Sequence, residues 1–311
     1  MEKENKNESI SFWSKHAKKW EDMAYNKNND HLNFPISQQR QDITISEIQN
    51  LCQNKNMSIV DFGCADGKLV MGLIKNGYFN VKGIDNSKEM IDVAKNRLEE
   101  ENPDINVNNI FFNDDVDTYD ENNKADVITA MGLIEYLLNI DDFFRKLKNM
   151  LNDGGYAFIE SRNKLFNLFS ANEFTCKSNI AELVEELKDI DRFSPINDKE
   201  KIKEIIRNII VKYGANLEQI KSNEKSEEKE KFEKYPFNLP QYTPKDIEHF
   251  CKNNGLKLKY VIYYHPHPFR PVLEHCIPQL FNSLALHMEP LGYTPIGSTI
   301  CSSFIAVIQK I

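Results

Sequence analysis

Along the chain, the spacing of hydrophobic positions changes near residue 57. Before that point apolar side chains such as Trp13 and Ala17 recur at helical intervals, so we predict an N-terminal helical cap over residues 1–56. Beyond it, short apolar runs alternate with segments of helical length. This alternation predicts parallel strands joined by helical crossovers, which form a sheet covered on both faces. The strands are expected at 58–62, 78–84, 109–112, 125–130 and 156–160, and the helices at 68–75, 87–98 and 140–151.

A long interruption separates the fifth predicted strand from the last two. Between residues 161 and 243 the strand pattern is absent, and helical periodicity appears at 180–190 and 199–213. Residues 222–234 form a mixed-charge run, which is typical of a solvated helix face or a loop. The strand pattern then returns, with a helix expected over 243–254, a strand over 256–264, a helix over 272–288 and a strand over 299–308.

The order of these elements predicts an α/β fold with a doubly wound, mostly parallel seven-stranded sheet and an inserted helical lid. We expect the binding core over residues 57–162, the insertion over 163–242 and the C-terminal part of the core sheet over 243–311. Apolar residues of the insertion, such as Phe166 and Phe169, suit either a lid that excludes water or a dimer surface. The sequence leaves both readings open.

Composition and charge narrow the class of protein. Hydrophobic residues make up 41% of the 311 residues, enough for a large core, and the formal net charge is −8. A negative chain repels nucleic acid and anionic membranes, so neither partner is expected. No apolar run reaches the roughly 18 residues of a membrane span, and the charged N-terminus is unlike a signal peptide. The six scattered cysteines indicate free thiols, so we predict a cytoplasmic protein.

The first candidate site is the glycine-rich turn after the strand at 58–62. Asp61, Gly63, Ala65 and Gly67 form the pattern D-x-G-x-A-x-G, in which glycine permits close approach of a ligand to the backbone. The following helix would offer unpaired N–H groups, and Asp61 could accept a hydrogen bond from a ligand ammonium. A nicotinamide dinucleotide site would require G-x-G-x-x-G, whereas the last glycine here stands one position too early.

Four further segments follow in order. The second strand ends at Asp85, whose carboxylate is placed to accept both hydroxyls of a ribose, and Ser87 is a candidate N-cap for the next helix. The others are FFNDDV at 111–116, DVITAMGLIEY at 126–136 and MLNDGGY at 150–156. With the turn at 61–67, these segments resemble the motifs of the class I S-adenosylmethionine-dependent methyltransferases. The resemblance covers residues 58–162 well and residues 243–311 by element order only.

This resemblance implies a Rossmann-like fold and S-adenosylmethionine as the cofactor. The family places an Asp after its third strand against the adenine amino group; Asp115 matches by position, with Asp114 as the neighbouring alternative. Ala65 replaces a glycine of many members, so a positive φ there would weaken donor binding. The N-terminal segment resembles one that closes over the donor. The expected donor-binding residues are Asp61, Gly63, Ala65, Gly67, Asp85, Asn86, Asp115, Met131, Tyr25 and Arg40.

A second candidate site is the segment HPHPFRP, which follows the strand at 256–264. Ligands of open α/β sheets lie beyond the carboxyl ends of the strands, so we expect this loop at the pocket rim. His265 or His267 could serve as the general base for a hydroxyl acceptor, and Arg270 could engage an anionic group. The alternative is a rigid surface loop whose histidines make local hydrogen bonds. No other ligand cluster supports the His-x-His pair, so no metal site is expected. The expected substrate contacts are Glu135, Tyr136, Arg162, Tyr264 and Arg270.

We therefore expect an S-adenosylmethionine-dependent methyltransferase that acts at oxygen or nitrogen of a small polar acceptor, such as a sugar, a nucleotide-linked sugar or a secondary metabolite. Two alternatives stay open. One is a peptide or protein methyltransferase that docks its substrate on the insertion, and the other is a non-catalytic module that binds the donor. The intact residues Asp61, Gly63, Gly67 and Asp85 argue against the second. The acceptor and the oligomeric state do not follow from the sequence.

Overall fold

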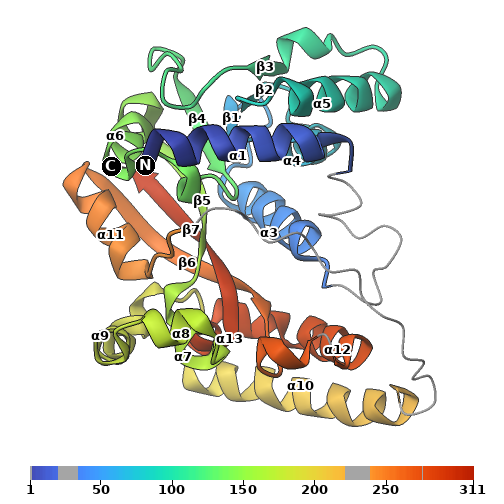
Figure 1. Cartoon of the computed structure of the whole chain (residues 1–311), viewed down its shortest axis with the longest axis vertical. Coiled ribbons are helices and arrows are strands. Elements are labelled where there is room, and N and C mark those ends of the chain that lie inside the picture. The colour runs from blue at the N-terminus through green and yellow to red at the C-terminus, as the bar shows by residue number, and fades with distance from the viewer. Residues whose placement is uncertain (1, 20–33, 221–238, 275) are drawn as a thin grey trace.

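The centre of the molecule is a sheet of seven strands, seen here in a computed structural model that describes residues 2–19, 34–220, 239–274 and 276–311. The strands are β1 Ile59–Phe62, β2 Val81–Asp85, β3 Phe111–Asn113, β4 Ala125–Ala130, β5 Leu151–Arg162, β6 Leu256–Pro266 and β7 Cys301–Lys310. Their order in the sheet is β3-β2-β1-β4-β5-β7-β6 (Figure 1). Only β7 runs antiparallel to its neighbours, which confirms the predicted mostly parallel sheet.

Helices cover both faces of this sheet. In β1, Ile59 packs into one apolar layer and Val60 into the other, as the alternation of side chains along a strand requires. Because both faces are buried, the strands are apolar along most of their length. For this reason the sequence shows them as short apolar runs. The layer on the side of Ile59 contains α3 Ile36–Leu51, α4 Lys68–Lys75 and α5 Lys88–Glu101, and the layer on the side of Val60 contains α6 Ile140–Met150 and α11 Pro244–Asn253.

Two helix starts follow from local side-chain chemistry. The Ser87 hydroxyl accepts a hydrogen bond from the N–H of Met90 at 3.2 Å, which confirms Ser87 as the N-cap of α5. At α11, Thr243 and Asp246 form a reciprocal capping box, and Pro244 occupies the first turn. Both caps satisfy backbone N–H groups that would otherwise lack partners at the start of a helix.

The segment between β5 and α11 begins and ends side by side, since Asn163 near its start and Tyr242 near its end form a short parallel bridge. In Figure 1 its helices lie at the lower end of β6 and β7, and α10 packs against α12 Pro278–Met288. The predicted charge run at 222–234 lies outside the described residues. The helices of this segment are α7 Asn167–Ser170, α8 Glu173–Lys177, α9 Ile180–Glu186 and α10 Lys199–Ile220.

The continuous helix expected over 272–288 is wrong. A 3-10 turn over Pro271–Leu273 comes first, and α12 begins only at Pro278. Ile277 has φ −141°, outside the helical region, because a proline ring disfavours helical backbone at the preceding residue. Glu274 therefore lies in an irregular connection between the two pieces.

Two further helices bear on the site. The first, α1 Glu2–His16, packs against α5 and crosses in front of the sheet in Figure 1. Its Trp13 ring meets the ring of Tyr136 edge to face with centroids 6.3 Å apart. The short α13, Gly297–Ile300, leads into β7. None of the described helices combines the length and the apolar character that crossing a bilayer requires.

Candidate active site

A cavity of about 710 Å³ lies at the carboxyl ends of the parallel strands. One side of it is covered by α1, through Ser9, Ile10 and Trp13. This is the location that the topology of an open α/β sheet favours for ligands. Every parallel strand contributes a residue to the wall at or just beyond its end: Gly63 after β1, Asp85 of β2, Asp114 after β3, Met131 after β4, Arg162 of β5 and His265 of β6.

In the turn after β1, every second residue from Gly63 to Gly67 has a positive φ. The φ angles are 69° at Gly63, 46° at Ala65 and 77° at Gly67. Gly63 and Ala65 line the cavity, whereas Gly67 does not. A Cβ on Gly67 would lie 2.6 Å from the Phe111 ring, so glycine is needed there for close packing of the turn. The alanine at the middle position thus has the positive φ for which the sequence analysis expects weaker donor binding.

Asp85 is held in place by backbone groups. Its two carboxylate oxygens accept hydrogen bonds from the N–H of Ala65 at 3.0 Å and of Ser87 at 2.8 Å. Each oxygen keeps a second lone pair, so both can still accept from a ribose hydroxyl. Burial raises the pKa of Asp85 to about 6, against the two backbone hydrogen bonds that lower it. The neighbouring Asn86 also lines the cavity.

Asp61 lies at the end of β1 and is almost fully buried. The Thr129 hydroxyl donates a hydrogen bond of 2.6 Å to its carboxylate. Burial raises the pKa of Asp61 to about 7, although Thr129 and the positive charge of Arg40 act in the opposite direction. A ligand ammonium would stabilise the ionised form in this place. Met131, predicted beside the donor, also lies in the wall.

The structure distinguishes the two candidates for the adenine contact. Asp114 lines the cavity, and Asp115 does not. The Asp115 carboxylate instead accepts a hydrogen bond of 2.9 Å from the N–H of Asp117, which stabilises the turn after β3. The geometry thus favours Asp114, the alternative in the sequence prediction, because Asp115 faces its own turn.

A network of three hydrogen-bonded side chains lies in the cavity wall. Arg40 of α3 donates a hydrogen bond of 2.8 Å to Glu160, and the Tyr264 hydroxyl donates one of 2.5 Å to the other oxygen of that carboxylate. All three residues line the cavity. Arg40 was predicted as a donor contact and Tyr264 as a substrate contact, and the structure joins both through Glu160. No sequence pattern marked Glu160 as functional, because it lies inside a strand.

Glu135, Tyr136 and Arg162 form a wall beyond β4 and β5. One oxygen of Glu135 accepts from the Arg162 N–H at 2.9 Å, and the other has no hydrogen-bond partner among the described residues. Burial and the nearby charge of Glu160 raise the pKa of Glu135 to about 7. A buried carboxyl group with an unoccupied oxygen can accept from or donate to a bound acceptor.

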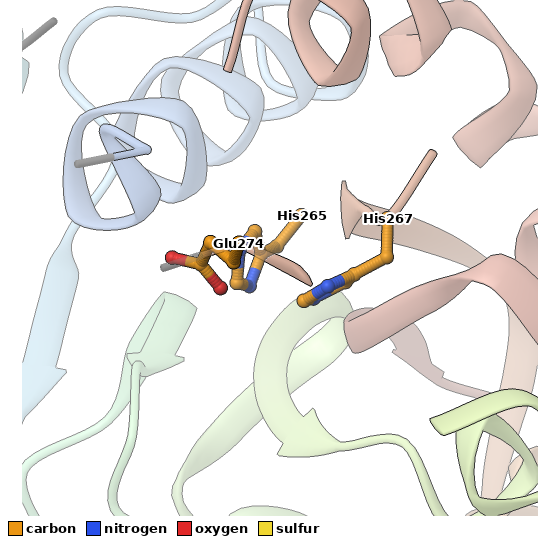
Figure 2. Close-up of side chains that lie close together, drawn as sticks. All are labelled: His265, His267 and Glu274. Carbon is orange, nitrogen blue, oxygen red and sulfur yellow. The ribbon is translucent and has the colours of Figure 1, made fainter. Parts of the chain in front are cut away.

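The structure brings His265 and His267 into the same cavity, as the sequence predicted. The strand expected to end at residue 264 continues to Pro266, so His265 lies within β6 and only His267 follows it. Their ring centroids lie 4.3 Å apart. Glu274, which the sequence analysis did not single out, lies beside His265 (Figure 2). Burial lowers the pKa of His267 to about 3, so its ring stays neutral and is a poor proton acceptor.

Besides Gly67 and Asp115, two further predicted contacts are not part of the described wall. Arg270 is exposed and precedes the 3-10 turn that starts at Pro271, so the loop places it outside the cavity. Tyr25 lies outside the described residues. The sequence missed Ser302, whose hydroxyl lies 2.7 Å from Nδ1 of His265, because nothing in a strand pattern marks one serine of β7 as functional.

The order of the strands and the glycine-rich turn at residues 63–67 are those of a class I methyltransferase domain. A family model described as a methyltransferase domain matches residues 36–260, which is more than half of the chain. The chain belongs to this family. Its members use S-adenosylmethionine, which confirms the class and the cofactor predicted from the motifs.

Relatives of known name share this domain. The chain is 28% identical over 162 residues to a ubiquinone biosynthesis O-methyltransferase of Coxiella burnetii, an alignment that covers 52% of this chain and 64% of that protein. It is 26% identical over 171 residues to a carboxy-S-adenosyl-L-methionine synthase of Campylobacter lari, with 52% and 65% covered. The chain thus spans less than two thirds of the length of either relative.

The fold is also similar to that of a solved S-adenosylmethionine-dependent methyltransferase from Clostridium acetobutylicum. The TM-score is 0.50 at 12% sequence identity, and the alignment covers 95% of this chain and 98% of that one. At this identity the likeness concerns the fold alone. It agrees with the predicted Rossmann-like architecture.

Proposed function

We propose that the chain transfers the methyl group of S-adenosylmethionine to oxygen or nitrogen of a small polar acceptor. The observation that carries this proposal is the continuity of the cavity. Residues suited to the donor, such as Asp85 and Gly63, line the same space as Glu135 and His265. Transfer from a sulfonium is an in-line displacement, so it requires both ligands in one enclosed space.

The size and the walls of the cavity support a small acceptor. A volume of about 710 Å³ lies within the usual range for small-molecule and cofactor sites. The acceptor end combines apolar rings, such as Phe166, with the polar groups of Glu135 and Arg162. Apolar rings beside a few polar groups suit a small polar acceptor, such as a sugar, a nucleotide-linked sugar or a secondary metabolite. The names of the two relatives denote different reactions, so they do not identify the acceptor.

Within this proposal the two histidines have unequal roles. A general base works best when its pKa is near the working pH, and burial moves that of His267 far below it. His265 is therefore the candidate base of the pair. The free thiols of all six cysteines fit a reducing compartment, and we place the reaction in the cytoplasm.

The test is a transfer assay with methyl-labelled S-adenosylmethionine against fractionated metabolites and, in parallel, against peptides. We expect label in a metabolite fraction. Label in peptides alone would support a peptide methyltransferase, and donor binding without transfer to either pool would support a non-catalytic module.

The two histidines, at the end of β6 and in the loop after it, are tested with the double variant His265→Ala/His267→Ala. Turnover should fall by more than about tenfold, while donor affinity measured by calorimetry changes by less than about twofold. Equal losses in turnover and donor affinity would make the loop structural. The exposed His249 of α11 provides the matched control, since His249→Ala should change neither quantity.

A further inference from the structure

Three side chains with metal-binding atoms converge in the cavity wall, at the end of β6 and in the connection that follows it. His265, His267 and Glu274 each offer one ligand atom, and these atoms all lie within 4.8 Å of one another. In Figure 2 the ring of His267 extends toward that of His265, and Glu274 lies at the other side of His265. All three residues line the cavity. Among the described residues, no other cluster of this kind occurs.

The buried ring of His267 is the first observation that indicates a ligand at this cluster. Its side chain is 3% exposed, and neither ring nitrogen has a hydrogen-bond partner among the described residues. Leaving a buried polar group without a partner costs about 1–3 kcal/mol, so such groups are rare unless something else satisfies them. Apolar rings surround it, with the centroids of Phe166 and Phe281 at 4.6 and 5.3 Å. A ligand that binds imidazole nitrogen would remove this cost.

His265 is positioned by residues from two other elements. Its Nδ1 lies 2.7 Å from the Ser302 hydroxyl of β7, and its backbone N–H donates to the Gln39 side chain of α3 at 2.8 Å. Metal-binding histidines usually bond through their second nitrogen to such a partner, which fixes the ring and its tautomer. With Nδ1 held by Ser302, Nε2 is the nitrogen that would face an ion.

The backbone at His265 is unusual as well. Its φ is 55°, in the left-handed region that a residue with a Cβ rarely adopts. His265 and His267, on either side of Pro266, both line the cavity. Strained backbone of this kind persists where the surrounding structure requires it, which is most often at functional sites.

We propose that His265, His267 and Glu274 bind a divalent transition-metal ion of the zinc type in the active-site cavity. Two imidazoles and one carboxylate are a common protein ligand set for Zn²⁺ and for Fe²⁺. Mg²⁺ and Ca²⁺ prefer oxygen ligands throughout, so this site disfavours them. The sequence predicted no metal site because no other ligand cluster supported the His-x-His pair, and Glu274, within the helix expected over 272–288, was not singled out.

The geometry requires only local adjustment. Ligand atoms around a tetrahedral ion at bond lengths of about 2.0–2.1 Å lie about 3.3 Å apart. The largest separation here is at most 4.8 Å, so side-chain rotation must bring the ligands together by up to about 1.5 Å. Glu274 is half-buried and lies in an irregular connection, where such rotation is unhindered by helix packing.

Three protein ligands leave a coordination position of the ion open toward the cavity. A hydroxyl or amine of the acceptor could occupy this position, and the ion would lower the pKa of a bound hydroxyl. In that case the ion would activate the acceptor in place of His265, because a histidine bound to the ion through Nε2 and to Ser302 through Nδ1 cannot also serve as general base. That role rests on the proposed function, whereas the binding of the ion does not.

The test uses the full chain, freed of metal with a chelator and titrated with Co²⁺ and then with Zn²⁺. We expect one Co²⁺ per chain, visible absorption bands of nitrogen- and oxygen-bound Co²⁺, and loss of these bands as Zn²⁺ displaces it. Mg²⁺ in excess should not displace it. No stoichiometric binding of either ion would overturn the proposal.

Variants locate the ion. His267→Ala should weaken Zn²⁺ binding by at least about 100-fold and Glu274→Gln by at least about tenfold. Loss of a residue that only hydrogen-bonds to a metal ligand already lowers metal affinity by about 10–100-fold. His249→Ala is the matched control and should leave binding unchanged. Should His267→Ala fail to fold, Glu274→Gln decides, because it keeps the shape of the side chain. Zn²⁺ binding that is unaffected by Glu274→Gln, or weakened as much by His249→Ala, would place the ion elsewhere and overturn the proposal.

The same preparations separate this inference from the proposed function. Donor affinity is measured in each variant by calorimetry, and methyl transfer is measured in the labelled assay. Metal binding without methyl transfer would defeat the proposed function and support the metal site. Transfer at an unchanged rate in metal-free protein that still binds Zn²⁺ would confine the inference to binding and remove the activating role.

Discussion

The two ends of the cavity are built in different ways. At the donor end, short local segments do the work: the turn from Gly63 to Gly67 presents its backbone, and Asp85 is fixed by the N–H groups of Ala65 and Ser87. At the acceptor end, single side chains come from the ends of β5, β6 and β7 and from connections between distant elements. A common cofactor can thus be bound by local backbone geometry, while an individual acceptor needs a set of side chains that only folding brings together.

The ends also differ in how their polar groups are satisfied. The Asp85 and Asp61 carboxylates already accept hydrogen bonds from the protein. By contrast, Glu135 has one oxygen and His267 both ring nitrogens without a partner among the described residues. The donor end is therefore preorganised, whereas the acceptor end carries groups that await a ligand and reduce the stability of the ligand-free protein.

The strongest test of the preorganised donor end is Asp85→Ala. Loss of the buried carboxylate should weaken S-adenosylmethionine binding by about 1–3 kcal/mol, roughly 5–150-fold, because the ribose hydroxyls lose a charged partner. Calorimetry measures the change, with the exposed Asp92→Ala on α5 as control. Unchanged affinity would remove Asp85 from the ribose site and with it the contrast between the two ends.

At the acceptor end, Glu135→Gln should stabilise the protein above neutral pH. Burial and the charge of Glu160 raise the pKa of Glu135 to about 7, so the folded protein holds a proton that the unfolded chain releases near pH 4.5. Folding stability therefore falls as pH rises through this window, by about 1–3 kcal/mol, and the variant lacks this fall.

Urea unfolding of both proteins at pH 5 and pH 8 measures the difference. The gain from Glu135→Gln should be present at pH 8 and small at pH 5. Glu182→Gln, which removes an exposed carboxylate of α9, should show no such gain. Parallel curves for the wild type and Glu135→Gln would show that this carboxyl group is no burden on the fold.

Donor binding should depend on pH through Asp61. Burial raises the pKa of this group to about 7, and a ligand ammonium requires its ionised form. Affinity should therefore rise about tenfold from pH 6 to pH 8, because a group of that pKa goes from about one tenth to about nine tenths ionised. Asp61→Asn should bind more weakly and lose most of this dependence. A flat profile in the wild type would show that Asp61 does not meet the ammonium.

The smallest effect is expected at Ala65. Its φ of 46° favours glycine, so Ala65→Gly should relieve strain and raise donor affinity or stability by about 0.5–1 kcal/mol. Ala65→Val should act in the opposite direction, because a β-branched residue tolerates this conformation poorly. Thermal shift and calorimetry measure both variants. Equal behaviour of the two would show that this position carries no backbone strain.

Several elements could be predicted because their signals are local. The runs of β1 and β4 are apolar since both sheet faces bury them, and the caps at Ser87 and Thr243 depend on residues within one turn. A local signal also explains why the helix expected over 272–288 is interrupted: Pro278 disfavours helical backbone at Ile277. Local chemistry decided both outcomes.

The sequence by itself determined the class of fold, the glycine-rich turn and the acid at Asp85, because each depends on residues that are close together in the chain. Tertiary structure alone decided that Asp114 rather than Asp115 lines the cavity, that Arg270 stays outside it, and that Glu160 joins Arg40 to Tyr264. The same holds for the approach of Glu274 to the two histidines. These contacts depend on the direction in which a loop leaves its strand, and that direction is set by packing against elements far away in sequence.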